Sequence, residues 1–423
     1  MCLSSLIITG GYPVSGEVQV QGSKNAVLPL LAASLLVKGT TVIEHCPDIS
    51  DVTCMLEILK SLGCTVLRDK ETVIIDAEIL GRSAVSRQNA EKMRSSISLL
   101  GALLGREGRA RIPLPGGCSI GKRPVDLHLM ALRCLGAEIE EKDELYAVLR
   151  KCHSAEIVFP YPSVGAVQNV ILASVVSSAS IVMRNCAREP EVEELCMFLN
   201  RAGANIRGGG TDTIIVTGVK KLCEIRYIVR SDRIVAGTLL SMAAATQGDI
   251  TVKGIDPFEL SAVTNVFANM GCQVKLYTDA ISLRADGRVR CLPLLKTLPY
   301  PGFPTDMQSQ LISVLIQARG TSVVRETVFE NRLGIVPELR RMHADIVVNR
   351  REQAAIIRGR DKRYLHAAEL MAPDLRAGAA LVVAAMAVEG TSTIKKSEYV
   401  ERGYENMAQL VRSVGGSCQV LSE

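Results

Sequence analysis

The stretch Leu62-Gly63-Cys64-Thr65-Val66 carries the pattern that organises this chain: an apolar residue, a glycine and a small residue precede a β-branched strand. Five further copies follow, beginning at Leu135, Ala202, Met270, Met342 and Val414. Neighbouring copies begin 73, 67, 68, 72 and 72 residues apart. Repetition at a near-constant period indicates a fold built from six similar units.

Each unit is predicted to hold two helices, with strands between and after them. In the first unit an apolar helix over 28–37 leads to a strand over 39–43. A second helix over 52–62 has its apolar side chains on one face, which is typical of a helix that covers a core. The glycine of the motif then ends this helix in a left-handed cap.

The period alone also admits a solenoid, but solenoid repeats usually run to about 20–50 residues, and these units are longer. Six units in 423 residues suit two domains of three units each, with the middle of the chain near Arg230. The strand-like segment 6–20 precedes the first unit and can pair with the far end of the chain. The predicted fold class is α/β, with six repeats of an α/β unit.

Composition excludes several classes of protein. The chain is 48% hydrophobic and 22% charged, which is typical of a folded globular protein. Aromatic residues make up 4% and the net charge is only +5. We therefore expect neither a base-stacking platform for single-stranded nucleic acid nor a basic surface for duplexes.

The cysteines and histidines point to a reducing compartment without metal. The 13 cysteines show no Cys-x-x-Cys pair, and the 5 histidines lack ligand spacing, so no disulfide framework and no metal site are expected. The start of the chain lacks a secretory pattern, and its apolar runs are shorter than a bilayer span. We expect a soluble cytoplasmic protein that binds no membrane.

The stretch from Pro115 to His128 is the first candidate for chemistry. Three glycines surround Cys118, and Lys122 and Arg123 follow at once. Glycine lets a loop wrap around a ligand, while nearby cations favour the thiolate and suit an anionic substrate. The alternative is that Cys118 is a small buried apolar residue, as most cysteines are.

Two other loops carry polar residues at predicted helix starts. Lys24 beside Asn25 suits an anion, although a plain N-cap with a solvated lysine would have the same sequence. Asp306 follows a rigid Pro-Gly-Phe-Pro segment. A carboxylate positioned in this way is a candidate general base, and an ordinary N-cap is the alternative.

Three arginines lie in corresponding loops of the C-terminal units: Arg332, Arg376 and Arg402. As a group they suit an anion clamp. Singly, each would be a surface salt-bridge partner.

Longer motifs, spread over essentially the whole chain, resemble those of the UDP-N-acetylglucosamine 1-carboxyvinyltransferases of the enolpyruvyl transferase family. The most specific are Ser23–Ala26, Lys92–Ser96, Pro115–His128, Pro162–Ala166, Ala187–Glu191, Gly302–Gln308, Phe329–Arg332, Asp374–Ala377 and Arg402–Glu405. The resemblance implies a two-domain inside-out α/β barrel with three repeats per domain. One domain would be 24–231, carrying Cys118; the other would be 1–23 with 232–423, carrying Asp306 and the C-terminal arginines.

The resemblance also implies an enzyme and its reaction. The enolpyruvyl group of phosphoenolpyruvate passes to the 3-hydroxyl of UDP-N-acetylglucosamine, and phosphate leaves, in the first committed step of peptidoglycan synthesis. That step belongs to cell-wall biogenesis, and it is the target of fosfomycin. No metal or organic cofactor is implied, and a monomer is the default expectation.

Residue roles carry over by motif. Cys118 matches the general acid that protonates the methylene carbon and can form an adduct with phosphoenolpyruvate, and Asp306 matches the carboxylate that takes the proton of the sugar hydroxyl. Lys24 and Arg402 match cations that hold phosphoenolpyruvate and serve in catalysis. Further residues matched to substrate contacts are Asn25, Arg94, Arg123, Pro124, Val125, Asp126, Leu127, Tyr161, Pro162, Ser163, Val164, Val328, Arg332, Asp374 and Arg376.

The chain departs from the family pattern at a few places. Val235 stands where Glu is common, Pro373 where Thr is usual, and His343 replaces a glycine of the repeat. Leu333-Gly334-Ile335 replaces a Phe-Met-His run. Two alternatives therefore stay open: a non-catalytic regulatory paralogue that binds the nucleotide sugar, and the sibling 3-phosphoshikimate enolpyruvyl transferase, which lacks the cysteine loop.

Overall fold

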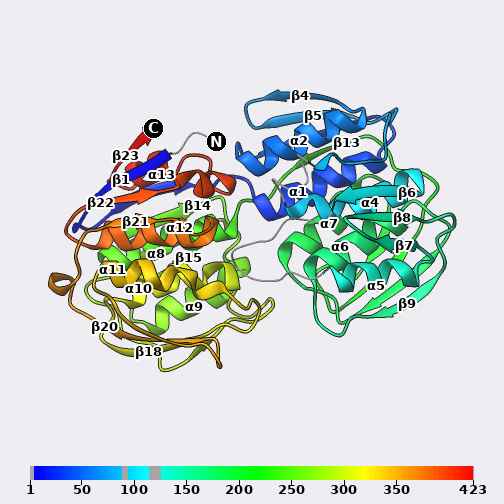
Figure 1. Cartoon of the computed structure of the whole chain (residues 1–423). Coiled ribbons are helices and arrows are strands. Elements are labelled where there is room, and N and C mark those ends of the chain that lie inside the picture. The colour runs from blue at the N-terminus through cyan, green and yellow to red at the C-terminus, as the bar shows by residue number, and fades with distance from the viewer. Residues whose placement is uncertain (1–3, 88–93, 114–124, 423) are drawn as a thin grey trace. The chain divides into compact units, whose positions relative to one another are not determined.

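The structure is a computed structural model that describes residues 4–87, 94–113 and 125–422. The described chain divides into two compact units. Unit 1 comprises residues 4–21 and 231–422, and unit 2 comprises residues 22–87, 94–113 and 125–230. Figure 1 labels the helices and strands of each.

Unit 2 begins where the chain leaves its first two strands. Its helices are α1 (Lys24–Ala33), η1 (Ser34–Leu36), α2 (Ser50–Leu62), η2 (Arg94–Ile97), α4 (Ser98–Glu107), α5 (Asp126–Cys134), α6 (Val164–Ser174) and α7 (Pro190–Arg201). Its strands are β3 (Thr40–Glu44), β4 (Thr65–Asp69), β5 (Thr72–Asp76), β6 (Arg109–Pro113), β7 (Glu138–Glu141), β8 (Glu144–Val148), β9 (Ala155–Val158), β10 (Ser180–Arg184), β11 (Asn205–Arg207), β12 (Thr213–Thr217) and β13 (Ile225–Ile228).

Unit 1 combines the first strands with the second half of the chain. Its helices are α8 (Arg233–Thr246), η3 (Pro257–Leu260), α9 (Ser261–Asn269), η4 (Thr305–Met307), α10 (Gln308–Leu315), η5 (Arg332–Ile335), α11 (Val336–Arg341), η6 (Lys362–Tyr364), α12 (Leu375–Ala387), η7 (Ser397–Arg402) and α13 (Met407–Ser413). Its strands are β1 (Ser4–Gly10), β2 (Ser15–Gln19), β14 (Asp249–Lys253), β15 (Gln273–Leu276), β16 (Ala280–Arg284), β17 (Leu295–Lys296), β18 (Gly320–Arg325), β19 (Asp345–Asn349), β20 (Ala354–Gly359), β21 (Glu369–Met371), β22 (Gly390–Lys395) and β23 (Ser417–Ser422).

The predicted repeat is confirmed in both units. Each copy runs through a buried helix, a strand, a second helix and further strands, as in α1-β3-α2-β4-β5 and α10-β18-α11-β19-β20. Over the described residues the strands form six sheets, three in each unit. A strand from outside the copy joins most sheets in parallel, as β13 joins β3 and β2 joins β14.

The N-terminal strand closes the last repeat. β1 pairs antiparallel with β22 and with β23, so that Leu6 lies opposite both Ile394 and Val420. The expectation that segment 6–20 pairs with the far end of the chain is therefore confirmed for β1, whereas β2 pairs with β14 instead. This pairing also ties β1 to unit 1 although the chain next enters unit 2.

Each unit is held together by helices that are buried on all sides. In unit 1, α8, α10 and α12 pack against one another (Figure 1), and every residue of α8 is buried. A helix that is apolar all round belongs in a core rather than on a surface. The apolar helix predicted at 28–37 lies in the core of unit 2, as α1 with η1, and α12 lies in the core of unit 1.

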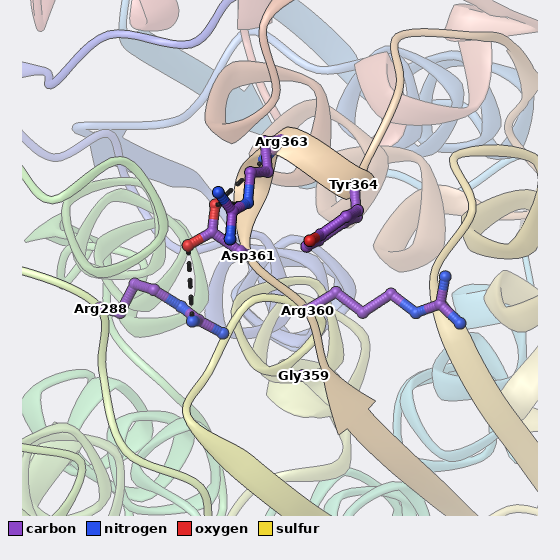
Figure 2. A pocket seen from close by; sticks show the side chains of 6 residues that line it. All are labelled: Arg288, Gly359, Arg360, Asp361, Arg363 and Tyr364. Carbon is purple, nitrogen blue, oxygen red and sulfur yellow. Dashed lines mark hydrogen bonds and ion pairs between the residues drawn. The ribbon is translucent and has the colours of Figure 1, made fainter.

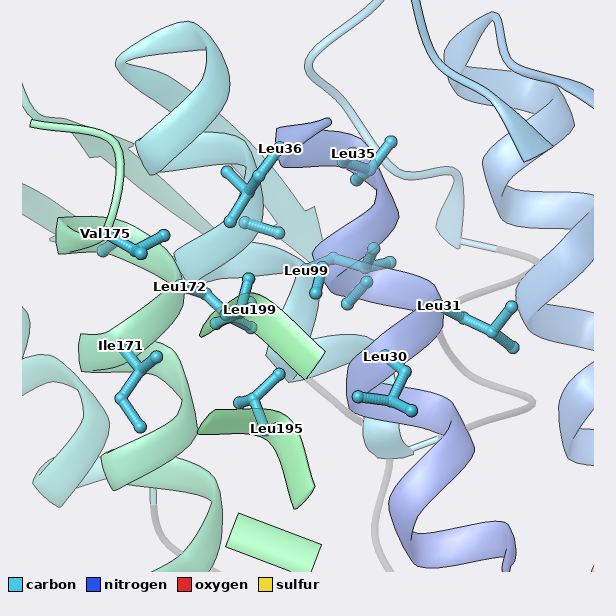
Figure 3. Close-up of a cluster of buried hydrophobic side chains, with 14 of the residues drawn as sticks. Leu30, Leu31, Leu35, Leu36, Leu99, Ile171, Leu172, Val175, Leu195 and Leu199 are labelled. Atoms are coloured by element: carbon cyan, nitrogen blue, oxygen red, sulfur yellow. The ribbon is translucent and has the colours of Figure 1, made fainter. Parts of the chain in front are cut away.

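The core of unit 2 gathers side chains from several of its helices. Figure 3 shows Leu30 and Leu31 of α1, Leu99 of α4, Leu172 of α6 and Leu195 of α7 in one cluster. α4 approaches α6 so closely that a Cβ on Gly101 would lie 2.4 Å from the Asn169 carbonyl oxygen. A larger residue at this position would push the two helices apart.

The repeated motif ends the second helix as predicted. Gly63 caps α2 with φ 111°, in the left-handed region that glycine tolerates best. His343 takes the same place after α11 with φ 65°, a strained conformation for a residue with a Cβ. Its ring meets that of His366 edge-on, with 4.6 Å between centroids.

Within the described ranges, no helix is long and apolar enough to cross a membrane. The cysteines of the same ranges form no disulfide bonds. Burial raises the pKa of the Cys196 and Cys272 thiols to about 12, so these side chains stay protonated and unreactive at neutral pH.

Candidate active site

Asp306 lies at the centre of a charged cluster in unit 1. Its Oδ1 accepts a hydrogen bond from Arg332 Nη2 at 2.5 Å, and its Oδ2 accepts one from Arg376 Nη2 at 2.8 Å. The arginine side chains are 2% and 5% exposed, whereas that of Asp306 is 25% exposed. The carboxylate is thus fixed at both oxygens and still reachable from outside.

This geometry decides between the alternatives left by the sequence. Asp306 belongs to η4, directly ahead of α10, and its side chain makes no capping bond for either helix. The N-cap interpretation is therefore wrong. The interpretation of Arg332 and Arg376 as surface salt-bridge partners is also wrong, because both are buried.

Local structure explains how Arg376 reaches Asp306. Asp374 caps α12, accepting hydrogen bonds from the backbone N–H groups of Arg376 at 2.9 Å and Ala377 at 3.0 Å. The cap places Arg376 in the first turn of an otherwise apolar helix. Asp374, predicted as a substrate contact, has this structural role in addition to any other.

Arg376 retains an unused donor. Its Nη1 is buried and, among the described residues, has no hydrogen-bond partner. Burial lowers the pKa of Arg376, but the nearby charges of Asp306 and Asp232 raise it by more than burial lowers it. The guanidinium therefore stays charged. A buried charged donor left unpaired is costly, which favours an acceptor from a ligand or water at this atom.

A polar layer extends from the cluster into the core of unit 1. The hydroxyls of Tyr404 and Thr238 lie 2.7 Å apart, and Gln310 Nε2 donates to Thr238 Oγ1 at 3.2 Å. Thr238 donates its own proton to the Ile234 carbonyl, so the Tyr404 hydroxyl is the donor to Thr238. Burial raises the pKa of Tyr404, which keeps the phenol neutral.

Glu326 is a site-forming residue that the sequence did not reveal. Its side chain is buried and accepts from the hydroxyls of Thr297 at 2.9 Å and Thr305 at 3.0 Å. It also accepts from the backbone N–H of Val328 at 2.8 Å. Glu326 therefore fixes the loop of Val328 against the residue that precedes Asp306. A glutamate at the end of a strand gives no such signal in sequence.

Lys24 forms the second charged centre, in unit 2. Its Nζ lies 2.7 Å from Asp51 Oδ2, and the two side chains are 10% and 4% exposed. Ser23 caps α1, accepting from the backbone N–H of Ala26 at 3.3 Å, and Asn25 is half-buried. The N-cap part of the alternative interpretation is right, but a solvated lysine is wrong.

Close backbone packing places Lys24. The Ser23 N–H donates to the Arg230 carbonyl at 2.8 Å. A Cβ on Gly22 would lie 1.8 Å from the His45 carbonyl oxygen, so only glycine fits before the cap. The chain therefore enters α1 in one fixed direction.

The predicted nucleotide-sugar residues flank the starts of α5 and α6. Val125 precedes α5, which begins with Asp126 and Leu127, while Tyr161, Pro162 and the N-cap Ser163 precede Val164, the first residue of α6. A Cβ on Gly165 would lie 2.8 Å from the His128 ring, so the two helix starts are in contact. Tyr161 is 40% exposed.

His128 and Asn169 join these helices. Asn169 Nδ2 lies 2.7 Å from His128 Nδ1, and its Oδ1 accepts from the Gly101 N–H at 2.6 Å. An amide nitrogen can only donate, so Nδ1 of His128 is the acceptor and the neutral ring carries its proton on Nε2. Sequence reasoning assigned no role to either residue.

Other predicted site residues fall outside the described chain. Cys118, Arg123 and Pro124 belong to segment 114–124, and only the backbone of Arg94 is described, at the start of η2. Arg402 is half-buried at the end of η7. Asp306, Arg332 and Arg376 are the predicted residues that the structure brings into direct contact within unit 1.

The departures from the family pattern lie in the scaffold. Val235 is buried in α8, with its N–H bonded to the N-cap Asp232 at 3.1 Å. Leu333 and Ile335 belong to η5, where Ile335 is buried. None of these side chains contributes a polar group to the Asp306 cluster.

A separate surface hollow of about 530 Å³ in unit 1 contains none of the predicted site residues. Figure 2 shows Arg288 and Arg363 on two sides of Asp361, with the Arg360 guanidinium directed away from it. The charged atoms of Arg288 and Asp361 are 3.6 Å apart, and those of Arg363 and Asp361 are 3.9 Å apart. Within the described part of the chain, no group of three His, Cys, Asp or Glu residues could hold a metal ion.

Comparison with known proteins places this geometry in a family. The family model for EPSP synthase (3-phosphoshikimate 1-carboxyvinyltransferase) matches residues 8–410. The UDP-N-acetylglucosamine 1-carboxyvinyltransferase 2 of Caldanaerobacter subterraneus is 45% identical over 412 residues, covering 96% of this chain and 97% of that protein. The UDP-N-acetylglucosamine 1-carboxyvinyltransferase of Acinetobacter baylyi is 41% identical over 422 residues, covering 99% and 100%.

Solved structures share the fold. The enolpyruvyl transferase NikO from Streptomyces tendae matches with a TM-score of 0.89 at 23% identity, covering 100% of both chains. EPSP synthase from Acinetobacter baumannii matches with a TM-score of 0.75 at 18% identity, covering 99% of this chain and 100% of that chain. The fold class predicted from the repeat is thereby confirmed, and the chain belongs to the EPSP synthase (3-phosphoshikimate 1-carboxyvinyltransferase) family.

Proposed function

We propose that this chain transfers the enolpyruvyl group of phosphoenolpyruvate to the 3-hydroxyl of UDP-N-acetylglucosamine and releases phosphate, the first committed step of peptidoglycan synthesis. Relatives of that name align with nearly the whole chain at 45% and 41% identity. The structural observation that carries the proposal is Asp306, held at both oxygens by buried arginines and still 25% exposed.

Asp306 suits the role of general base toward the sugar hydroxyl. Two guanidinium groups favour its ionised form, and each occupies only part of the lone pairs of one oxygen. The ionised carboxylate can accept this proton, because the hydroxyl becomes acidic as its oxygen bonds to the electron-poor carbon of phosphoenolpyruvate.

The reaction proceeds by addition and elimination. In the addition, the sugar oxygen bonds to C2 of phosphoenolpyruvate, C3 gains a proton, and Asp306 takes the hydroxyl proton. In the elimination, the bond from C2 to the phosphate oxygen breaks and C3 loses a proton. We assign the proton donor to Cys118, which lies outside the described residues, so that this role rests on the motif alone.

Anionic substrates need cations that are already in place. Arg376 offers a buried Nη1 without a partner among the described residues, and Lys24 offers a buried ammonium. Preorganised charges of this kind hold an anionic substrate without reorganisation of solvent. We place Lys24, Arg332, Arg376 and Arg402 around phosphoenolpyruvate, with Arg94 and Arg123 as further candidates.

The nucleotide sugar is placed at the other predicted contacts. Val125 to Leu127 and Tyr161 to Val164 stand at the adjoining starts of α5 and α6, where free backbone N–H groups suit a diphosphate. Asn25 and Val328 complete this set. We further propose that unit 2, with bounds at 24–231, and unit 1, with bounds at 1–23 and 232–423, are the two substrate-binding domains. We also propose that the protein is a cytoplasmic monomer.

Phosphate release tests the proposal. Purified protein is mixed with phosphoenolpyruvate together with UDP-N-acetylglucosamine, with each substrate alone, and with shikimate 3-phosphate in place of the sugar nucleotide. Release that needs both of the first two substrates is expected. Fosfomycin should stop it and leave one adduct on the peptide containing Cys118, detected by mass spectrometry, and Cys118→Ala should carry none.

Two other results would overturn the proposal. Release with shikimate 3-phosphate would assign the activity of the family's name-giving enzyme. Calorimetric binding of UDP-N-acetylglucosamine without any release would favour a regulatory paralogue that only binds the nucleotide sugar.

A further inference from the structure

The ion pair between Lys24 and Asp51 is buried, and a buried ion pair contributes little to stability. The 2.7 Å contact joins two side chains that are 10% and 4% exposed. Taking both charges out of water carries a large penalty, so a buried ion pair is weak evidence of a stabilising role. Apolar residues of similar size would stabilise unit 2 at least as well.

The local backbone makes the position of Lys24 still less favourable. Lys24 is the first residue of α1, at the end where the helix dipole is positive. It is not needed to start the helix, because Ser23 already caps it. A buried cation at a helix N-terminus is useful chiefly where an anion approaches.

Asp51 compensates for both costs. It lies in the first turn of α2, where a carboxylate interacts favourably with the helix dipole. From there its Oδ2 contacts the ammonium at the start of α1. The pair therefore connects the N-termini of two helices of unit 2. The cation lies on α1, the first helix after the chain passes from unit 1 to unit 2.

We propose that Asp51 is a positioning residue that holds the Lys24 ammonium in place, and in its charged form, for an anionic group of phosphoenolpyruvate. The inference rests on the proposed function, in which Lys24 contacts that substrate. A free lysine side chain loses rotamer entropy when it is ordered. Asp51 imposes this loss during folding, so that substrate binding does not have to.

Steady-state kinetics of Asp51→Asn test the proposal. We expect the KM for phosphoenolpyruvate to rise about tenfold or more, while kcat and the KM for UDP-N-acetylglucosamine stay within about threefold. Asp51→Glu should recover part of the loss, because it restores the charge at a slightly different reach. A purely structural role would lower the active fraction, and hence kcat, without changing one KM.

Asp48→Asn is the matched control. Asp48 lies three residues earlier, pairs with Arg68 at 3.3 Å, and its side chain is 77% exposed. The substitution removes the same charge from the same segment. We expect both KM values within about twofold of the unaltered protein.

A second measurement does not depend on turnover. Only a neutral amine reacts with an acylating reagent, so acetylation of Lys24, followed by peptide mass spectrometry with exposed Lys70 as reference, reports on its charge. We expect faster acetylation of Lys24 in Asp51→Asn than in the unaltered protein or Asp48→Asn. If Asp51→Asn does not fold, Asp51→Glu takes its place in both measurements, with smaller shifts in the same directions.

The outcomes separate the two proposals. Unaltered protein that releases no phosphate would sink the proposed function, and the acetylation rates would still decide whether Asp51 holds Lys24 charged. Active protein in which the KM for phosphoenolpyruvate and the acetylation of Lys24 are unchanged in both Asp51 variants would overturn the inference alone. A lower KM in Asp51→Asn would also overturn it, since Asp51 would then compete with the substrate.

Discussion

Asp306 in unit 1 and Asp51 in unit 2 are both carboxylates paired with buried cations, but they are held differently. Asp306 accepts one hydrogen bond at each oxygen, from arginines in η5 and α12, and its side chain is 25% exposed. Asp51 meets one ammonium through Oδ2, and its side chain is 4% exposed. The cluster around Asp306 has a net charge of +1 and the pair around Asp51 has none.

The difference indicates how the two acids are used. A carboxylate fixed at both oxygens by rigid guanidinium groups has a defined orientation, and its exposure lets it meet a substrate. A carboxylate that is covered can act only on its partner. The difference in exposure supports the role proposed for Asp306 at the reacting atoms and the role proposed for Asp51 in orienting Lys24.

The largest effect should come from Asp306→Asn. The amide has the shape of the carboxylate but cannot take a proton, so kcat should fall by about 10²–10⁴-fold. Phosphate release gives kcat, and calorimetry should show that UDP-N-acetylglucosamine still binds. A change in KM with kcat within about threefold would erase the contrast with Asp51.

The free energy of unfolding tests whether the burial of the ion pairs at Asp306 matters. Arg376→Met leaves Asp306 with one arginine and should lower the free energy of unfolding by about 3 kcal/mol. This is the low end for a broken buried ion pair, because the Asp306 side chain is partly exposed. Arg284→Met is the control, since the 2.6 Å pair of Arg284 with Asp286 is exposed and should contribute at most about 1 kcal/mol. Urea unfolding measures both, and equal losses would show that burial is not decisive.

A smaller effect is expected in the polar layer behind Asp306. Tyr404→Phe removes the donor to Thr238 and should lower the free energy of unfolding by about 1 kcal/mol. Thr238→Val should lower it by about 1–3 kcal/mol, because the Tyr404 hydroxyl and the Gln310 amide both lose their hydrogen bond to Thr238. Thermal unfolding of both variants gives the order, and the reverse order would contradict this network.

An effect confined to alkaline pH concerns the tyrosine buried in unit 2. Burial raises the pKa of Tyr227 from 10.0 to about 12, so the folded state favours the neutral phenol. Its contribution to stability is complete below pH 10 and is lost as the pH rises from 10 toward 12. Urea midpoints over this range should fall less steeply for Tyr227→Phe than for the unaltered protein; parallel slopes would refute the assignment.

Much of the fold could be predicted because its signals are local. Gly63 after an amphipathic segment predicted the left-handed cap of α2, and the apolar run over 28–37 predicted the helix that is buried as α1 with η1. Even His343 was placed correctly by the period, although its φ of 65° is unusual for histidine. Each signal depends on neighbours within about four residues, the range over which helix caps and periodicity act.

The contacts of the site could not be predicted in the same way. Asp306 lies 26 residues from Arg332 and 70 from Arg376 along the chain, and nothing in that spacing says that the three meet. Both arginines were equally compatible with exposed positions. The N-cap interpretation of Asp306 failed because its carboxylate finds stronger, charged donors than a helix amide.

The repeat architecture and the contacts of the site thus have different physical origins. The six-unit α/β architecture and the chemical identity of the loops were readable in the residues alone, because backbone propensity and hydrophobic periodicity are short-range. The burial of Lys24, its contact with Asp51, and the convergence of two arginines on Asp306 arise only when distant elements pack, since desolvation and charge pairing depend on what lies nearby in space.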